Sequence, residues 1–245
     1  MLSHWIQRVN PVKRPLPAAT HDGTVPLPPE TQHYLQRAYP GNHNYRIVRG
    51  RLVPSWKLAT RYNQLSRHYP RPLKSVLDLS CSKGYFVLAA LADPTCQRAM
   101  GIDVVAESLA VCRSATQHLG CGARFEQLYL HELAARIDEF GGPFNTSLLV
   151  NTYQYMYLGG VRDSFCYDTH DEIFRLLREV TCGRLIFNNR TQLSDCQRDL
   201  RTLAEELGKA EEYRTDAVLA AAKKYFHLRY ESTLGRYPLW VLEAR

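Results

Sequence analysis

The residues with the clearest chemical potential lie between Asp78 and Asp103. Asp78 stands in an apolar run, and the small residues Ser80, Ser82 and Gly84 follow it at alternate positions. Small side chains let backbone N–H groups approach a ligand, and the apolar helical pattern after Gly84 places a helix N-terminus beside them. Asp103 ends a second apolar run. Together these features indicate a site for a nucleotide-type cofactor.

Two common forms of such a site do not fit the turn. An NAD site has the pattern G-x-G-x-x-G, whereas the turn here reads S-C-S-K-G-Y-F-V. A phosphate-binding loop of the form G-x-x-x-x-G-K-[ST] has no match in the chain. The remaining interpretation is a site for S-adenosylmethionine (SAM), whose methionine end needs close backbone approach and whose ribose needs an acid.

The elements that must position these residues alternate between strand and helix patterns. Five β/α units in succession predict a parallel sheet with helices on both faces, and Gly183 is expected to end the last of these helices. Two further helices and an alternating hairpin follow. We therefore predict an α/β fold with a mostly parallel, doubly wound sheet of seven strands that ends in an antiparallel hairpin. The predicted strands are 76–80, 98–104, 124–128, 144–151, 184–188, 226–232 and 237–242.

The N-terminal part of the chain differs in composition and charge. Prolines crowd residues 10–29, which predicts an extended arm, and helices are expected at 30–39 and from Ser55 to 68. Residues 1–75 hold 12 of the 31 Lys and Arg and two acids, so the excess positive charge lies before the cofactor turn. This charge favours an anionic partner, although a solvated basic surface without a ligand explains it equally. We predict an N-terminal extension over 1–73 and a cofactor-binding domain over 74–245.

The stretch V-L-D-L-S-C-S-K-G-Y-F, residues 76–86, resembles the first motif of class I SAM-dependent methyltransferases, V-L-D-[LIV]-G-C-G-x-G-x-[FL]. Asp103, in G-I-D-V, is similar to the family's ribose-binding acid. The resemblance covers roughly residues 74–245. Ser80 and Ser82 replace two family glycines, and Tyr153-Gln154-Tyr155-Met156 occupies the place of the L-H-H-L run of many small-molecule methyltransferases.

The resemblance implies SAM as the cofactor and assigns roles to individual residues. Asp78 and the turn would hold the methionine end, Asp103 the ribose, and Val104 the adenine. Asp78 could instead only order the turn, and Asp103 could be a helix N-cap. The implied cofactor-binding residues are Asp78, Leu79, Ser80, Cys81, Ser82, Gly84, Tyr85, Asp103, Val104, Asn151 and Thr152.

Catalysis would consist mainly of alignment, with a base for an oxygen acceptor. Tyr155 and His170 are the candidate bases, because both follow the fourth strand of the predicted sheet. Tyr155 could equally belong to the core or to a lid, and His170 could be a first-turn helix residue beside a Thr169 cap. The loop 157–167 could close over the substrate.

Three functions fit these features. The first is O- or N-methylation of a small or medium-sized anionic metabolite held by Arg46, Arg49 or Arg51, with Trp56 beside them. The second is a tRNA or rRNA methyltransferase whose N-terminal aromatic residues stack on bases. The third is a SAM-binding protein without transferase activity.

Cysteine usage and hydropathy indicate the compartment. The chain has seven cysteines, an odd number, and no C-x-x-C pair. This argues against a disulfide framework or a zinc site and for reduced thiols in the cytoplasm. No apolar run approaches the roughly 20 residues of a membrane span, and the N-terminus lacks the apolar core of a signal peptide. We expect a cytoplasmic protein with no metal and no membrane partner.

Overall fold

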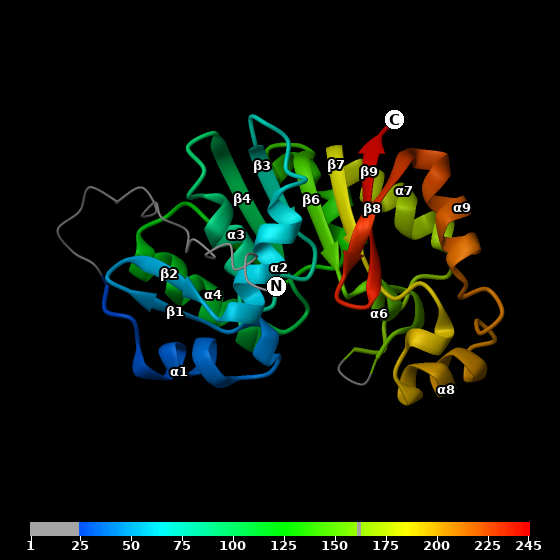
Figure 1. Ribbon diagram of the computed structural model, residues 1–245, viewed down its shortest axis with the longest axis horizontal. Coiled ribbons are helices and arrows are strands. Elements are labelled where there is room, and N and C mark those ends of the chain that lie inside the picture. The colour runs from blue at the N-terminus through cyan, green and yellow to red at the C-terminus, as the bar shows by residue number, and fades with distance from the viewer. Residues whose placement is uncertain (1–24, 161–162) are drawn as a thin grey trace, which may run out of the picture.

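The structure is a computed structural model that describes residues 25–160 and 163–245. The strands of its main sheet are β3 (Lys74–Asp78), β4 (Cys96–Ile102), β5 (Arg124–Glu126), β6 (Phe144–Val150), β7 (Thr181–Asn188), β8 (Phe226–Leu234) and β9 (Tyr237–Ala244). Their order across the sheet is β5-β4-β3-β6-β7-β9-β8 (Figure 1). Neighbours pair in parallel from β5 to β7, whereas β9 pairs antiparallel with both β7 and β8. This confirms the predicted mostly parallel sheet with a terminal antiparallel hairpin.

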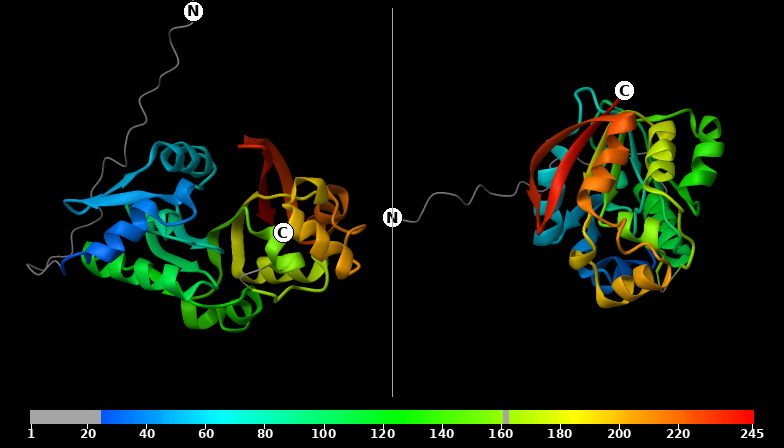
Figure 2. Two further views of the ribbon diagram at one scale, coloured as in Figure 1. Left: turned by 90° about the horizontal axis from the view of Figure 1, so that it is seen from below. Right: turned by 90° about the vertical axis from the view of Figure 1, so that its right-hand side faces the viewer.

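Helices cover both faces of the sheet (Figure 2). Successive residues of a strand point to opposite faces, and the fully buried Val76 and Leu77 accordingly belong to different hydrophobic clusters. Helices α1–α4 contribute to the cluster of Val76, and α5–α9 contribute to that of Leu77. The helices are α1 (Pro29–Arg37), α2 (Trp56–Ser66), α3 (Tyr85–Ala90), α4 (Ala106–Leu119), α5 (Leu130–Ala135), α6 (Tyr153–Leu158), α7 (His170–Val180), α8 (Arg198–Glu206) and α9 (Thr215–Tyr225).

The N-terminal elements pack onto the sheet domain rather than standing apart from it. Leu35 of α1 and Leu58 of α2 are buried in the same cluster as Val76. Between the two helices, β1 (Tyr45–Val48) and β2 (Arg51–Pro54) form a separate antiparallel hairpin. The two predicted helices are therefore present, whereas the hairpin was not predicted. The proline-rich arm lies mostly outside the described residues, and the division of the chain at residue 73 stays a prediction.

Gly183 has a different role from the one predicted. It lies inside β7 rather than at the end of α7. A Cβ atom at Gly183 would lie 2.3 Å from the carbonyl oxygen of Asn145, so the close approach of β6 explains the glycine. Helix α6, directly after β6, was not predicted.

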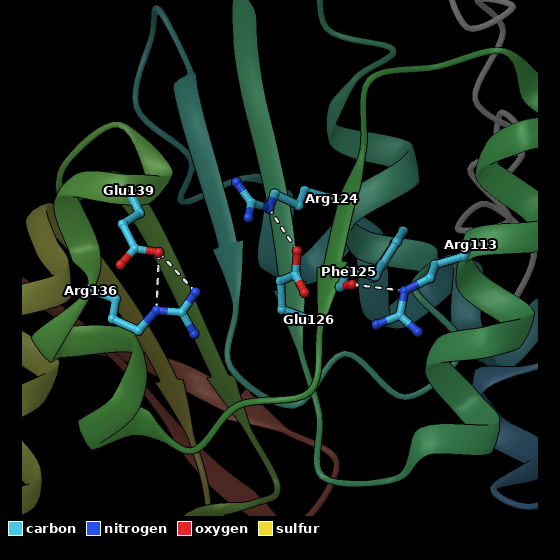
Figure 3. Close-up of polar contacts among 6 residues, drawn as sticks. All are labelled: Arg113, Arg124, Phe125, Glu126, Arg136 and Glu139. Atoms are coloured by element: carbon cyan, nitrogen blue, oxygen red, sulfur yellow. Dashed lines mark hydrogen bonds and ion pairs between the residues drawn. The ribbon is translucent and has the colours of Figure 1, made fainter.

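The edge strand β5 carries charged side chains. Arg124 pairs with Glu126 at 2.8 Å, and Arg113 of α4 donates its Nε–H to the carbonyl of Phe125 at 3.1 Å (Figure 3). Charges on a short edge strand oppose pairing with another chain.

Within the described ranges, no helix combines the length and the apolar character needed to cross a bilayer.

Candidate active site

A cavity of about 600 Å³ opens beyond the carboxyl ends of the parallel strands, where open α/β sheets bind their ligands. Its walls come from the turn after β3, the segments after β4 and β6, residues 39–43, and α8. A second hollow of about 670 Å³ adjoins it beside Val104 and Tyr129. The predicted site residues that line the 600 Å³ cavity are Leu79, Ser80, Ser82, Asp103, Val104, Asn151, Thr152 and Tyr155.

The turn after β3 adopts a left-handed conformation at Ser82, whose φ is 48°. This conformation costs a residue with a Cβ atom about 1–2 kcal/mol. A hydrogen bond of 2.8 Å from the Ser82 N–H to Asp103 Oδ2 holds the turn in place. The two segments that the sequence assigned to the cofactor are therefore joined directly.

Asp103 orders both of these segments. Its second oxygen, Oδ1, accepts a hydrogen bond of 3.0 Å from the Val105 N–H. Val105, and not Asp103, is the N-cap residue of α4. Because a carboxylate can accept about four hydrogen bonds, these two contacts are compatible with a further one from a ligand in the cavity.

Three of the predicted cofactor residues lie beneath the turn instead of lining the cavity. Gly84 has a φ of 73°, and a Cβ atom there would lie 2.7 Å from the ring of Phe125. Cys81 and Tyr85 are buried, and the Tyr85 ring lies 5.4 Å from that of Tyr45. These residues pack under the turn and support its conformation without lining the cavity.

Asp78 also lies below the cavity surface and is almost fully buried. Its Oδ1 accepts a hydrogen bond of 3.3 Å from the Ser80 N–H. Burial raises the pKa of Asp78 to about 7, the Ser80 hydrogen bond acts against this rise, and the Asp103 charge adds to it. Asp78 therefore contacts the cavity through the backbone of Ser80.

The segment after β6 is held by two residues that the sequence did not indicate. Asn189 Oδ1 accepts a hydrogen bond of 2.7 Å from the Thr152 N–H, and Arg190 donates to Asn151 Oδ1 at 2.6 Å. Asn151 has a left-handed φ of 61°. The Thr152 hydroxyl donates to Ser80 Oγ at 2.5 Å, so this wall is tied to the cofactor turn. The only local signal was the polar run Asn188-Asn189-Arg190 at the end of β7.

Comparison with known proteins identifies the fold. No protein-family model and no curated protein matches the chain. The structure is similar to the PH0226 protein from Pyrococcus horikoshii OT3, with a TM-score of 0.54 and 18% identity over 78% of this chain and 92% of that one. It is also similar to the bifunctional kinase-methyltransferase WbdD, with a TM-score of 0.50 and 19% identity over 76% of this chain and 38% of that one. The chain has the class I methyltransferase fold.

A third solved structure, EvdMO1, matches with a TM-score of 0.51 and 15% identity over 76% of this chain and 41% of the other. The chain thus spans less than half of WbdD and of EvdMO1. At these identities the likeness establishes the methyltransferase fold and nothing finer.

The far half of the 600 Å³ cavity is built from residues that the sequence did not single out. Met156, Phe165 and Tyr167 line it from the chain after β6, and Asp199 and Leu200 line it from α8. Tyr155, a predicted base, lies in this half and is exposed. The loop 157–167 contributes to this wall, and its residues 161 and 162 lie outside the described chain.

His170, the other predicted base, does not line the cavity. Its Nε2–H donates to the Glu212 carbonyl at 3.1 Å, so its Nδ1 accepts from the Tyr153 hydroxyl at 2.7 Å. The Tyr157 ring stacks on it at 3.9 Å, and burial lowers the pKa of His170. The structure places it in the core beside the Thr169 cap, as a neutral, fully hydrogen-bonded side chain.

The predicted substrate-binding residues also lie away from the cavity. Arg46, Arg49 and Arg51 are exposed on the β1–β2 hairpin, and Trp56, at the start of α2, is 72% exposed. None of the four lines the cavity. Alternation turns Tyr45, Ile47 and Leu52 inward and leaves Arg46 and Arg51 outside, and Arg49 lies in the turn between the two strands.

Residues 39–43 form a cavity wall for which the sequence gave no signal. His43 belongs to this wall, and its Nε2 accepts a hydrogen bond of 2.7 Å from Arg61 of α2. Burial, followed by the charges of Arg61 and Lys83, lowers the pKa of His43 to about 3. His43 is therefore a neutral acceptor at physiological pH.

The described residues bring together no cluster of His, Cys, Asp or Glu suited to a metal ion.

Proposed function

We propose that the protein is a SAM-dependent methyltransferase that acts on a small-molecule acceptor. One observation carries this proposal. The small-residue turn and Asp103 share a wall of the cavity and are joined by the Ser82–Asp103 hydrogen bond. A SAM molecule needs this combination of close backbone approach and a carboxylate.

The lining residues divide into roles along the bound cofactor. Ser80 and Ser82 would contact the methionine end, and Asp103 would accept hydrogen bonds from the ribose hydroxyls. Val104 and Leu128 would pack against adenine. Thr152, which is tied to both the turn and Asn189, would face the reacting end.

The bound cofactor supplies an activated methyl group, so the chain's own task is to align the acceptor and exclude water. Alignment of this kind lowers a barrier by roughly 7–11 kcal/mol. Met156, Phe165 and Leu200 give the acceptor half an apolar lining that displaces water. Tyr155, which lines this half, would accept or relay a proton there.

The charges of the cavity favour a neutral or cationic acceptor, such as an amine. Among the described lining residues, the charged side chains are Asp103, Asp163 and Asp199, and no Lys or Arg joins them. An ammonium group is stabilised by carboxylates and by aromatic faces such as Phe165. An anionic acceptor, as the basic N-terminal region predicted, would need contacts that Arg46, Arg49 and Arg51 do not make with this cavity.

A transfer assay tests this proposal. The protein is incubated with methyl-tritiated SAM and a small-metabolite extract divided by ion exchange into cationic, neutral and anionic fractions. We expect label in the cationic or neutral fraction, reduced at least about tenfold by Thr152→Val. Label confined to the anionic fraction would contradict the acceptor class. Absence of transfer to any fraction, and to total RNA in a parallel incubation, would contradict the methyltransferase proposal.

RNA is a second candidate acceptor because of the outer face of the hairpin. Arg46, Arg49 and Arg51 lie on it beside the exposed Trp56, and basic and aromatic side chains together bind single strands. This candidate predicts binding of total RNA that weakens with salt and with replacement of the three arginines by serine. RNA binding unchanged by these substitutions would exclude it.

A further inference from the structure

Lys83 occupies an unusual position inside the cofactor turn. It lies between Ser82 and Gly84, yet it does not line the cavity and is only 1% exposed. A lysine is almost never fully buried without partners. Burial lowers the pKa of Lys83 to about 8. Its position therefore needs an explanation in terms of the groups around it.

Those groups all come from the N-terminal part of the chain. Lys83 Nζ donates to the Ala38 carbonyl at 2.5 Å and to Asn44 Oδ1, and it lies 5.7 Å from the centre of the Tyr34 ring. The backbone carbonyl of Lys83 accepts a hydrogen bond of 2.8 Å from the Tyr45 hydroxyl. One residue of the cofactor turn is thus held at both its side chain and its backbone by residues 34–45.

The two hydrogen-bond acceptors of the ammonium have a particular spacing. Ala38 directly precedes and Asn44 directly follows residues 39–43, all five of which line the cavity. Inside this segment, one of the few backbone hydrogen bonds is that of 3.0 Å from the His43 N–H to the Pro40 carbonyl. The regular structure of this segment is a single turn of 3-10 helix, Gly41–His43. The charge-assisted bonds of Lys83 therefore join the two ends of a cavity wall that has few backbone hydrogen bonds of its own.

We propose that Lys83 is a positioning residue that fixes residues 39–43 as a wall of the cofactor site. This inference rests on the proposed function, in which the cavity binds SAM. Through Lys83 the turn that contacts the cofactor also determines where the N-terminal wall stands. Cofactor affinity should then depend on a side chain that does not touch the cofactor.

The test compares Lys83→Met with Lys57→Met, which removes an exposed lysine of α2. Hydrogen exchange of the amides of residues 41–44 is measured without ligand, and S-adenosylhomocysteine is titrated by calorimetry. In Lys83→Met we expect exchange to be faster and the dissociation constant to be larger, each by about tenfold. Lys57→Met should stay within about twofold of the wild-type protein in both measurements.

A second variant, Asn44→Ala, removes one acceptor and leaves Lys83 and the turn intact, so the test remains decisive if Lys83→Met does not fold. It should change both quantities in the same direction by about threefold. Wild-type exchange at residues 41–44 in the folded variants would overturn the proposal. So would faster exchange with unchanged affinity. Because exchange is read without ligand, a wild-type protein that binds no S-adenosylhomocysteine would refute the proposed function separately.

Discussion

Two of the segments that line the cavity, residues 39–43 and the loop 157–167, are each held at both ends by a lysine. Lys83 joins the residues on either side of 39–43. Lys209 Nζ donates to the carbonyls of Tyr157, at 3.0 Å, and Tyr167, at 2.8 Å, at the two ends of the other segment. Lys83 belongs to the cofactor turn, whereas Lys209 lies between α8 and α9.

Because the two lysines lie in different parts of the chain, the two halves of the cavity are held in place independently. The wall of residues 39–43 is tied to the turn that would contact SAM, and the loop 157–167 is tied to the part of the chain that includes α8. The first half is lined by Ser80, Ser82 and Asp103, and the second is lined mainly by apolar and aromatic side chains. Substitutions in the first half should change cofactor binding, and substitutions in the second should change acceptor use.

The largest expected effect comes from the turn itself. Gly84→Ala places a Cβ atom 2.7 Å from the Phe125 ring at a positive φ. We expect it to lower the free energy of unfolding by about 3–5 kcal/mol, measured by chemical denaturation. The matched control is Gly235→Ala in the β8–β9 turn, which also has a positive φ but has no atom within 4 Å of the added Cβ. A loss there as large as that at Gly84 would show that φ alone, and not packing under the turn, sets the requirement.

Asp78→Asn should remove a pH dependence that belongs to the cofactor half. The pKa of Asp78 is raised to about 7, so between about pH 4 and pH 7 the folded protein retains a proton that the unfolded chain releases. Wild-type stability should fall as the pH rises through this range and then level off. The amide of the variant would keep the acceptor for Ser80 without this loss, so Asp78→Asn should gain on the order of 2–4 kcal/mol at pH 8 and little at pH 4. Denaturation curves at both pH values measure this, and equal gains would contradict it.

Lys209→Met should affect only the acceptor half. Loss of its hydrogen bonds to the Tyr157 and Tyr167 carbonyls and to Cys166 Sγ releases the ends of the loop 157–167. We therefore expect kcat/KM for the acceptor to fall about tenfold. The affinity for S-adenosylhomocysteine should change by less than about twofold, which is the reverse of the Lys83→Met result. Equal losses of cofactor affinity in the two lysine variants would break the distinction between the halves.

Ser82→Gly should give the smallest effect. Ser82 has a φ of 48°, and glycine adopts that conformation without steric cost. Relief of this strain, reduced by the greater entropy of the unfolded glycine chain, should raise the free energy of unfolding by at most about 1 kcal/mol. Thermal unfolding measures the change. A destabilised variant would mean that the Ser82 hydroxyl contributes more than its backbone strain costs.

The sequence predicted the elements that local patterns define. The apolar run around Asp78 and the one that ends at Asp103 located two strands and the cofactor turn. Thr169 does cap α7, since its hydroxyl accepts from the Glu172 N–H at 3.1 Å. The hairpin turn at Arg49-Gly50 escaped prediction because an arginine with a φ of 51° leaves no signal in the sequence. The alternation of β1 and β2 distinguishes two faces of the hairpin, but it does not say which face contacts a ligand.

The rest of the site depends on contacts between distant segments. His170 became a core residue through Tyr157 and Glu212, the latter 42 residues away. Lys83 contacts Asn44, which lies 39 positions earlier in the chain, and Ala38, which lies 45 positions earlier. A count of charges in the N-terminal region does not say where each charged side chain lies. Arg46, Arg49 and Arg51 are exposed and do not line the cavity. Lys83, by contrast, is buried beneath it.

Calorimetric titration with S-adenosylhomocysteine is the direct test of our claim that Asp103 and the turn after β3 bind the cofactor. We predict micromolar binding by the wild-type protein, none of NADH, and a loss of about 100-fold in Asp103→Ala. Asp138→Ala, at an exposed acid remote from the cavity lining, should bind like the wild-type protein. Absence of wild-type binding, or equal affinity in Asp103→Ala, would contradict the claim.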